Sequence, residues 1–492
     1  MPREEYDVIV VGVGNAAMCA AMSAHESGAK KVVMLERASE DEAGGNSRFT
    51  AGSVRFAHNG LEDILTLVEL SNEERENNDF GTYTTDQFYD DMFRVTQYRT
   101  DPELCEILVT KSLETVQWLR SKGVRFVPNG EQCFKVGGKM KFWGGLALEF
   151  WGGGPGIWEM ESKIVGDLGI PIAFEHRVVS LLYDEEKVYG VRVKHEGKVF
   201  EMTAKSVVLA CGGFEANSEW RTRYLGPGWD LAKVRGTRHN MGDGIRMALD
   251  IGAMPYGNWA GCHAVGWDLN APEFGDLVVG TNFQKHSYPF GILVNADGKR
   301  FVDEGADFRN YTYAKYGREI LNQPGQFAWQ IFDQKVVDLW RAEYRIKQLT
   351  KVTDDTIEGL AAKLEGVNAE QFVKTIAEFN DAVMDEVTFN PAVLDGRGTR
   401  GLGLPKSNWA TKLDTPPFEA FAVTCGVTFT FGGLRINRNG QVLDTDLRPI
   451  PGLYAAGELV GGIFYFNYPG GTGLINGSVF GRIAGASTAK GV

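Results

Sequence analysis

The chain alternates between short, predominantly apolar runs and longer segments in which apolar residues recur at helical spacing. The run YDVIVVG (6–12) is rich in β-branched residues, which predicts a buried strand of a parallel sheet. The alanine-rich residues 15–25 predict a helix, and KKVVMLE (30–36) predicts a second strand. KSVVLACGG (205–213) and PIPGLYAAGE (449–458) predict two further buried strands. Strands that alternate with helices in this way are typical of an α/β fold.

Other patterns complete this outline. Residues 175–210 alternate between apolar and polar positions and contain hairpin turns, which predicts a β-meander. GDGIRMALDIGA (242–253) predicts a turn and a helix with Asp243 near its start. Residues 354–383 have helical spacing and one apolar face, so they predict two helices. Residues 470–490 predict a glycine turn and a terminal helix.

The first strand, turn, helix and second strand contain a complete dinucleotide fingerprint. Gly12 permits a tight turn, and Gly14 lets backbone N–H groups approach a pyrophosphate. Ala17 lets the helix pack close to the sheet, and Glu36 ends the second strand where it can accept from ribose hydroxyls. The alternative is a glycine-rich turn in an ordinary α/β protein. The fingerprint predicts an adenine dinucleotide but does not separate NAD from FAD.

The C-terminal segment favours FAD. A strand that ends in Ala456-Gly457-Glu458, followed by the helix of 470–490, returns the chain to the cofactor, and simple NAD enzymes do not need such a return. The strand at 205–213 also runs into Gly212-Gly213, which brings backbone beside a cofactor.

At this point the chain resembles a known flavoprotein family, that of fumarate reductases, succinate dehydrogenases and 3-ketosteroid dehydrogenases. The segments GVGNAA, GGNSRFTAG, ACGGF, GDGIRMALDIGA, GILVNADGKRFVDEG and AAGE occur along the whole chain in the family's order. Within the family, GNSR, VDEGADFRNYTYAKYGREIL and NYPGGTGL most resemble tricarballylate dehydrogenases. The resemblance implies a Rossmann-like, doubly wound FAD-binding domain (1–258 and 430–492) with an inserted α+β capping domain (259–429).

The resemblance also implies contacts to FAD. The pyrophosphate contacts are Gly12, Gly14, Asn15, Ala16 and Ala17, the adenosine contacts are Glu36, Arg37 and Val179, and the contacts along the ribityl chain and flavin are Gly45, Asn46, Ser47, Thr50, Ala51, Gly52, Gly457, Glu458, Gly473 and Leu474. Gly212 and Asp243 complete the expected cofactor residues. The GGNSRFTAG stretch lacks the histidine that often links FAD covalently in succinate dehydrogenases, so we expect non-covalent FAD.

Two catalytic candidates come from matched motifs. Arg309, in GKRFVDEGADFRNY, corresponds to the arginine that donates a proton in fumarate reductases. An arginine donates a proton only when it is desolvated and relayed to solvent, because its ordinary pKa is too high. The alternative is that Arg309 pairs with a substrate carboxylate or a nearby acidic residue. His263, in NWAGCHAVGW, corresponds to a histidine that touches the substrate carboxylate, and its alternative is an ordinary buried histidine.

Other positions depart from the fumarate reductases. Thr428 and Phe429 replace a histidine segment, Tyr468 replaces an arginine, and FQKHSYPFG lacks the expected glutamate–arginine relay, so fumarate is disfavoured. Tyr468 resembles the tyrosine that, with a glycine N–H, holds a carbonyl oxygen in ketosteroid dehydrogenases. Its alternative is an aromatic wall of the flavin pocket. Further candidates for the base, which the sequence does not rank, are Tyr288, His286, Tyr311 and Tyr313.

The substrate stays open between a polyacid and a flat ring. Tricarballylate needs several cationic partners, of which Arg48 and Arg55 could supply two. A cluster of aromatic residues favours a flat or cyclic compound if these residues face the flavin, although such stripes usually form core. These residues are Phe429, Phe431, Phe464, Tyr465, Phe466 and Tyr468.

Composition narrows the class of protein. The 492 residues are 43% hydrophobic, and the net charge of −13 argues against nucleic acid or an anionic membrane as a partner. The six cysteines contain no CxxC pair, hence no iron–sulfur, haem-attachment or zinc-ribbon motif, and we expect no metal. No signal peptide and no apolar run of about 18 residues is present, so we expect a cytoplasmic protein without a membrane span.

The sequence therefore predicts an FAD-dependent dehydrogenase. It would desaturate a carbon–carbon bond next to the carboxyl or carbonyl group of a small carboxylate or ketone, by hydride transfer to flavin N5. Electrons would then pass to a separate acceptor, namely a quinone, O2 or a redox protein. Two alternatives stay open: the reverse reaction on an activated alkene, and a flavin-binding subunit without turnover.

Overall fold

The largest sheet of the computed structural model, which describes residues 5–142 and 144–490, has eight strands. Six of them lie in the order β10-β11-β12-β1-β2-β9, β20 pairs with β12, and β19 pairs with β20. Their bounds are β1 Glu5–Val11, β2 Val32–Leu35, β9 Ile172–Ala173, β10 Arg177–Tyr183, β11 Val188–His195, β12 Lys198–Leu209, β19 Gln441–Leu443 and β20 Pro449–Ala455. β1 runs parallel to β2 and β12, and β12 runs parallel to β20. The predicted buried strands and the antiparallel meander β10-β11-β12 are confirmed.

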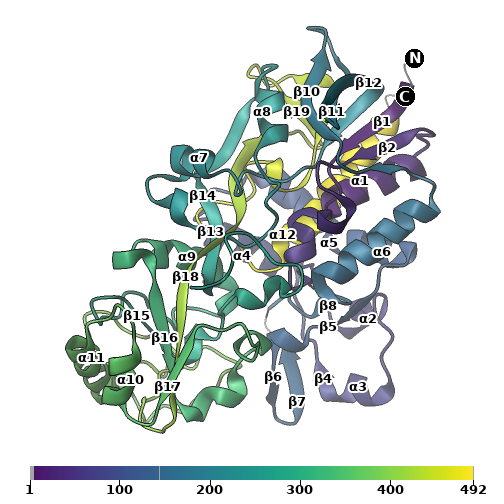
Figure 1. Ribbon diagram of the computed structural model, residues 1–492. Coiled ribbons are helices and arrows are strands. Elements are labelled where there is room, and N and C mark those ends of the chain that lie inside the picture. The colour runs from purple at the N-terminus through teal and green to yellow at the C-terminus, as the bar shows by residue number, and fades with distance from the viewer. Residues whose placement is uncertain (1–4, 143, 491–492) are drawn as a thin grey trace.

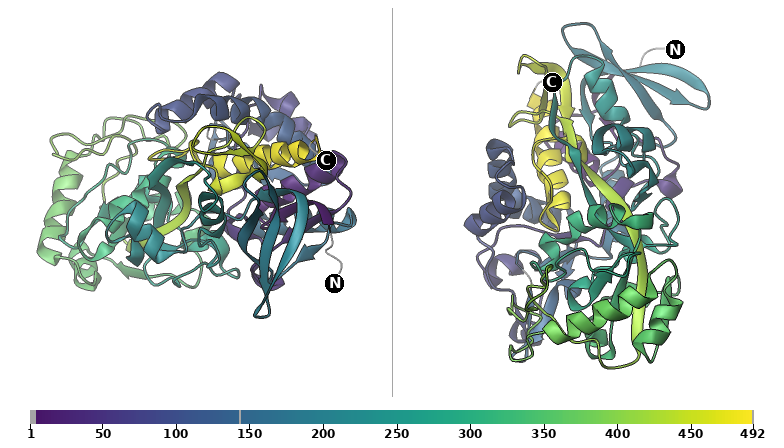
Figure 2. Two further views of the ribbon diagram at one scale, coloured as in Figure 1. Left: turned by 90° about the horizontal axis from the view of Figure 1, so that it is seen from above. Right: turned by 90° about the vertical axis from the view of Figure 1, so that its left-hand side faces the viewer.

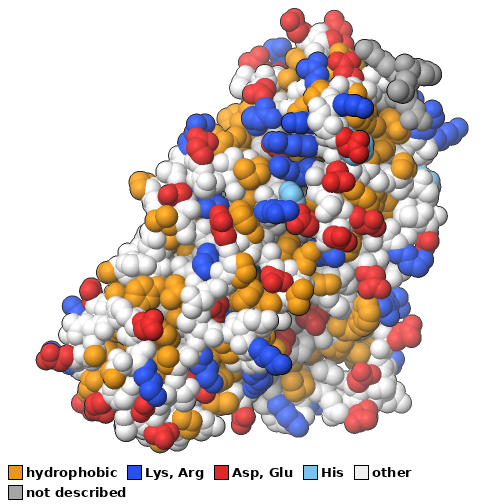
Figure 3. All heavy atoms as spheres, viewed as in Figure 1, with side chains coloured by type: hydrophobic (Ala, Val, Ile, Leu, Met, Phe, Trp, Pro, Cys, Tyr) orange, Lys and Arg blue, Asp and Glu red, His pale blue; other side chains and the backbone are white. Residues whose placement is uncertain are grey.

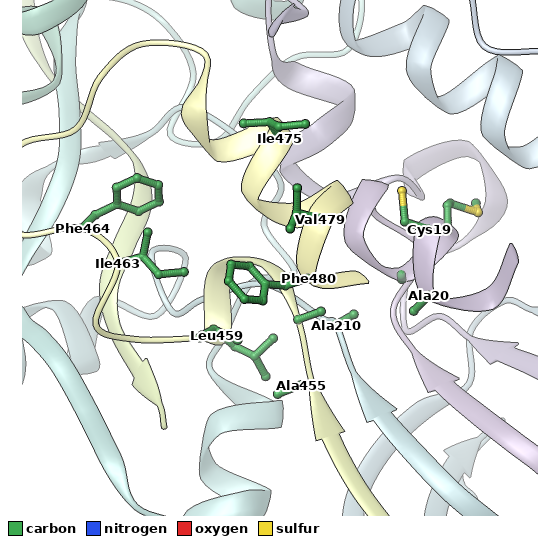
Figure 4. Packing of buried hydrophobic residues seen from close by; sticks show 14 of the residues in the cluster. Cys19, Ala20, Ala210, Ala455, Leu459, Ile463, Phe464, Ile475, Val479 and Phe480 are labelled. Carbon is green, nitrogen blue, oxygen red and sulfur yellow. The ribbon is translucent and has the colours of Figure 1, made fainter. Parts of the chain in front are cut away.

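Two helices from opposite ends of the chain pack side by side on this sheet (Figures 1 and 2). They are α1 (Asn15–Glu26) and α12 (Thr472–Lys490). A Cβ atom at Gly481 would lie 2.3 Å from the Ala16 carbonyl oxygen, so this glycine allows the two backbones to approach closely. Figure 4 shows Val479 and Phe480 of α12 among buried apolar residues of the sheet and of α1. The return of the C-terminal helix to the N-terminal strand is therefore built by close packing.

A second sheet has six strands, β13 (Lys233–Val234), β14 (Pro255–Asp268), β15 (Ile292–Val294), β16 (Ala328–Phe332), β17 (Lys351–Asp354) and β18 (Phe418–Leu434). β18 pairs with β13, β14, β16 and β17, and it runs from the second sheet toward the first (Figure 1). The predicted helices within 354–383 are present as α10 (Ile357–Lys363) and α11 (Ala369–Ala382), which share an apolar core with this sheet. The predicted limits at 258/259 and 429/430 fall inside β14 and β18, and the division into domains stays a prediction.

Smaller elements complete the fold. Two three-stranded sheets contain β3 (Ser53–Val54), β5 (Phe126–Pro128) and β8 (Leu148–Phe150), and β4 (Asn78–Asp79), β6 (Cys133–Val136) and β7 (Lys139–Phe142). The other α-helices are α2 (Leu61–Leu65), α3 (Asn72–Asn77), α4 (Thr85–Val95), α5 (Pro102–Lys122), α6 (Gly153–Asp167), α7 (Ser218–Trp220), α8 (Asp243–Leu249) and α9 (Tyr313–Leu321).

The visible surface carries charged side chains of both signs. On the face shown in Figure 3, Lys and Arg side chains are interspersed with Asp and Glu. Among the described helices, none is both long enough and apolar enough to cross a bilayer. The six cysteines are free thiols.

Candidate active site

A large cavity lies where the first turn after β1, the start of α12 and the inner end of the second sheet meet. It encloses about 1680 Å³ of space, its open mouth included. Its lining combines the dinucleotide fingerprint with buried charged and aromatic side chains, which suits a cavity for both a cofactor and a substrate. One end is lined by the dinucleotide fingerprint and the other by residues that follow β13, β14 and β15.

The fingerprint turn leaves backbone donors facing the cavity. Gly12 has φ of 107°, and a Cβ atom there would lie 2.4 Å from the Ala210 carbonyl oxygen, so only glycine fits. The N-cap of α1 is Gly14, which has no side chain to cap the first turn. The positive end of α1 is therefore available to a phosphate.

The part of the cavity next to the end of β2 suits an adenosine. Glu36 is 8% exposed, lines the cavity, and has a pKa raised by burial. Arg37 and Arg177 also line the cavity, and both pair with Asp243 at 2.8 and 2.9 Å. Asp243 is thus engaged by two arginines, and its role is to hold the cavity wall rather than to carry a free charge.

Most of the predicted cofactor residues line this cavity. They are Gly12, Gly14, Asn15, Ala16, Glu36, Arg37, Gly45, Asn46, Ser47, Thr50, Ala51, Gly212, Asp243, Gly457, Glu458, Gly473 and Leu474.

Three predicted cofactor residues are not in the lining. Ala17 is fully buried within the core around α1. A Cβ at Gly52 would lie 2.8 Å from the Gly153 Cα, so Gly52 serves contact with α6. The Val179 carbonyl accepts from Arg246, and its neighbour Val178 lines the cavity instead. The contact expected of Val179 is one of its backbone, and it stays a prediction.

The opposite end of the cavity holds a buried cluster of arginine and histidine side chains. Arg309 is 4% exposed, donates from Nη2 to the Gln132 side chain, and has Nη1 3.5 Å from His286 Nδ1. Burial and the neighbouring Arg341 lower the pKa of Arg309 to about 10. Arg235, 7% exposed, donates from Nη2 to Thr281 at 2.9 Å, and burial lowers its pKa.

Two buried histidines lie among these arginines. His263 and His286 are each 3% exposed, and burial lowers both pKa values well below the ordinary range, with Arg235 lowering that of His263 and Arg309 that of His286. Both are therefore neutral at pH 7. The ring of Tyr313 lies edge-on to both histidines, with centroids 4.8 and 5.0 Å away.

Several side-chain nitrogens of this cluster have no partner within the described protein. They are Arg235 Nε, Arg309 Nε, His263 Nε2, His286 Nε2 and Asn310 Nδ2. Buried polar atoms are almost always hydrogen-bonded in folded proteins. Their concentration on one wall indicates a ligand with several acceptor atoms.

Of the other sequence candidates, His286 and Tyr313 line the cavity, and four do not. Tyr288 is 3% exposed, shares a hydrogen bond of 2.6 Å with Thr312, and does not line the cavity, so its predicted role as the base is not supported. The Tyr311 hydroxyl donates to Asp91. Arg55 is fully buried and donates to the Gly470 carbonyl at 2.7 Å, and Arg48 donates to backbone carbonyls near its own turn. Neither arginine is a substrate partner.

The predicted aromatic wall is mostly core. Phe429 and Tyr468 line the cavity, whereas Phe431 and Phe464 are buried against them without reaching it. Phe466 is 37% exposed. Of the six residues, these two line the cavity, which Phe49 and Tyr313 also line. The six aromatic residues named from the sequence therefore give little support to a large flat substrate.

Sequence reasoning missed three residues of the cluster. Arg235 follows β13, and Arg341 and Gln132 come from short connecting segments. None of these carries a motif, and only the folded chain brings them to Arg309. Asn310 is next to Arg309 in the sequence, so the motif that identified Arg309 could also have identified Asn310.

Comparisons with known proteins agree with this geometry. A family model described as an FAD binding domain matches residues 7–474. A probable fumarate reductase, Ifc3, of Shewanella frigidimarina (strain NCIMB 400) is 32% identical over 499 residues, which cover 99% of this chain and 76% of that protein. The open conformation of a flavocytochrome c3 fumarate reductase matches with a TM-score of 0.74 at 29% identity, over 100% of this chain and 79% of that one.

A further solved structure shows the fold alone. The 3-ketosteroid Δ1-dehydrogenase of Sterolibacterium denitrificans matches with a TM-score of 0.74 at 22% identity, over 99% of both chains. The Gly12 turn, the uncapped start of α1 and the length of the cavity fit FAD. The predicted family resemblance is confirmed: the chain belongs to the FAD-binding flavoproteins, the family of the fumarate reductases and ketosteroid dehydrogenases.

Proposed function

We propose that this protein is an FAD-dependent oxidoreductase that acts on a carbon–carbon bond next to a carboxylate. The observation that carries the proposal is the pair Arg235 and Arg309, two buried guanidinium groups on the wall of the cofactor cavity. Among the described residues, neither has a carboxylate oxygen within 4.0 Å. A buried charge without a partner is costly, so the missing partner is expected to be the substrate.

The third arginine of the cluster is already neutralised. Arg341 Nε lies 3.2 and 3.1 Å from the two carboxylate oxygens of Glu343, which is itself 2% exposed. Positive charge is therefore in excess at this end of the cavity. A neutral ketone would leave that charge uncompensated, whereas a carboxylate would pair with it through charge-assisted hydrogen bonds.

The contacts of Arg309 suit proton donation. Its cation lies in a dry site with a lowered pKa, and His286 Nδ1 is 3.5 Å from its Nη1 and 4.0 Å from Glu343. Glu343 binds Arg341, which reaches Glu131, a side chain that is 43% exposed. Glu343, Arg341 and Glu131 lie between this cluster and solvent, but the 4.0 Å separation of His286 Nδ1 from Glu343 is longer than a hydrogen bond. Bound FAD supplies the hydride, and Arg309 supplies the proton to the adjacent carbon.

This arrangement favours reduction of an unsaturated acid as the direction. Dehydrogenation, the direction predicted from the sequence, is the second candidate, and one observation favours it. Tyr313 and Tyr468 both line the cavity, with ring centroids 6.2 Å apart, and one phenol could accept a proton while the other stabilises the charge that forms on the substrate. A small polyacid such as tricarballylate stays a predicted substrate for this direction. Electrons would be exchanged with a separate partner.

Flavin spectra test the proposal and its direction. Anaerobic protein is mixed with saturated acids, headed by tricarballylate, and with cyclic ketones, and dithionite-reduced protein is mixed with the corresponding unsaturated compounds. We expect reduced flavin to be reoxidised by unsaturated acids. If a saturated acid bleaches the oxidised flavin, the favoured direction is dehydrogenation, and a carboxylate remains the class of substrate. A response to ketones alone would refute the carboxylate, and no response to any compound would favour a subunit without turnover.

Replacement of Arg235 tests the carboxylate site separately. We expect Arg235→Gln to raise the KM for an acid substrate by roughly 30-fold or more, because loss of one partner from a buried charge pair costs about 2 kcal/mol or more. Arg238→Gln is the matched control, since Arg238 is three residues away, 59% exposed and paired with Glu42. Equal KM values in the two variants would show that Arg235 does not bind the substrate.

The cofactor is expected to be bound without a covalent link. The GGNSRFTAG stretch beside the cavity contains no histidine. Acid denaturation followed by filtration should release all of the flavin into the filtrate. Flavin that stays with the precipitated chain would contradict this expectation.

A further inference from the structure

Two glutamates that take no part in the reaction above meet at the cofactor cavity. Glu215 follows the glycine turn after β12 and is fully buried. Glu458 follows β20 and lines the cavity, with 9% exposure. Glu458 Oε1 lies against the backbone of Gly213, two residues before Glu215, and each carboxyl group acts on the pKa of the other. The structure therefore places two acidic groups in contact in a dry site.

The hydrogen bonds around the pair distinguish the two glutamates. Glu215 Oε1 accepts from the side-chain amides of Asn46 at 2.5 Å and Asn240 at 2.6 Å. Glu458 Oε1 accepts from the backbone N–H and the hydroxyl of Thr430, at 2.8 and 3.1 Å. Glu215 Oε2 has no donor among the described residues unless Glu458 carries a proton. A proton on Glu458 would supply the missing hydrogen bond.

The surrounding charges match a single negative charge. Arg221 is 2% exposed, lies close enough to Glu215 to interact with its charge, and donates only to backbone carbonyls, including Glu215 O at 2.5 Å. A further titratable group near Glu215 is the Cys262 thiol on β14, which stays neutral because burial raises its pKa to about 12. The charge of Arg221 is also felt by Glu273 and Asp230, so it can balance at most one negative charge on the pair, and two carboxylates would repel each other.

The backbone makes room for this contact. A Cβ atom at Gly213 would lie 2.2 Å from Glu458 Oε1 and 2.1 Å from Thr430 Oγ1. Any side chain at Gly213 would push Glu458 away from its present position. Burial, and the nearby Glu215, raise the pKa of Glu458 well above its ordinary value. Glu458 is thus the member that holds the proton.

We infer that Glu215 and Glu458 hold one proton between them, and that the pair binds a second proton from solvent when the bound cofactor gains negative charge. In this step the external reductant gives electrons to FAD, a solvent proton binds the Glu215–Glu458 carboxylate, and one O–H bond forms. The inference rests on the binding of FAD and on no particular substrate. It assigns the pair a charge-compensating role beside the cofactor.

Infrared spectroscopy of the FAD-loaded protein tests the shared proton. We expect Glu215→Gln and Glu458→Gln each to remove the same protonated-carboxyl band, because the new amide donates to the remaining carboxylate and keeps it ionised. Glu161→Gln is the control, since Glu161 is a separate buried carboxyl whose pKa burial also raises, and its loss should leave the pair's band in place. A band that persists in Glu215→Gln would mean that Glu458 is protonated by itself, which would overturn the sharing.

Reduction of the same samples by dithionite, with no substrate present, tests the second proton. The wild-type spectrum should gain the band of one further protonated carboxyl, and the double variant Glu215→Gln/Glu458→Gln should not. An unchanged wild-type spectrum in this region would overturn the charge-compensating role, and this measurement stands even if a variant fails to fold. A wrong assignment of substrate or direction leaves all of these outcomes untouched.

Discussion

Arg309→Ala is expected to lower the turnover of an acid substrate by roughly 10²–10⁴-fold, the usual contribution of a positioned proton donor. Arg309 is buried at the cavity, and its Nη1 lies 3.5 Å from His286 Nδ1. Among the described residues, it has no carboxylate oxygen within 4.0 Å. Steady-state kinetics with the best substrate from the flavin screen would measure the loss. FAD content should stay unchanged, because Arg309 lies at the end of the cavity away from the fingerprint turn.

Two observations separate proton donation from a structural role. Arg318→Ala is the matched control, since Arg318 lies on α9, donates to the Ala260 carbonyl and does not line the cavity. The pH profile is the second. Because burial lowers the pKa of Arg309 to about 10, the cationic donor is present below that pH and is lost as pH rises through it. Wild-type activity should fall in that range, and full turnover by Arg309→Ala would refute the assignment.

Gly12→Ala is expected to abolish FAD binding. The new Cβ would lie 2.4 Å from the Ala210 carbonyl oxygen, which follows β12, so β1 and β12 could not keep their present spacing at the phosphate turn. Overpacking of this kind costs about 1–3 kcal/mol, and the left-handed backbone at Gly12 costs a further 1–2 kcal/mol for any other residue. Flavin absorbance per protein and the Tm would measure both effects.

Gly28→Ala separates the two causes. Gly28 has φ of 112°, close to the 107° of Gly12, but a Cβ there would meet no atom within 4 Å. This control carries the backbone strain without the steric clash, so it should bind FAD normally and lose only about 1–2 kcal/mol of stability. Loss of FAD in both variants would mean that strain, rather than the close approach, governs the turn.

The fold was largely readable from the sequence because its elements are specified locally. The apolar runs of β1, β2, β12 and β20 reflect burial on both faces of a parallel sheet, and the glycine turn before α1 requires a particular backbone. Position within a strand was less certain. Val178 lines the cavity, whereas the carbonyl of Val179, for which a backbone contact was expected, accepts from Arg246.

The substrate end was less readable because its charges come from distant segments. Arg309 and His263 were found through motifs, but Arg235, Gln132 and Arg341 lie in connections with no motif, and their positions depend on how the second sheet packs. The basic residues that the sequence offered, Arg48 and Arg55, are used to hold backbone carbonyls. A count of arginines does not show which of them are left without a partner.

The sequence by itself determined the dinucleotide fingerprint, the parallel strands that carry it and the C-terminal return, since each depends on residues that are neighbours in the chain. Only the tertiary structure decided which polar groups are buried, which of them are paired, and which face the same cavity. Those properties set the charge of the site, and they depend on contacts between residues such as Gln132 and Arg309 that are far apart in sequence. The same holds for Glu215 and Glu458, whose contact is made by folding alone.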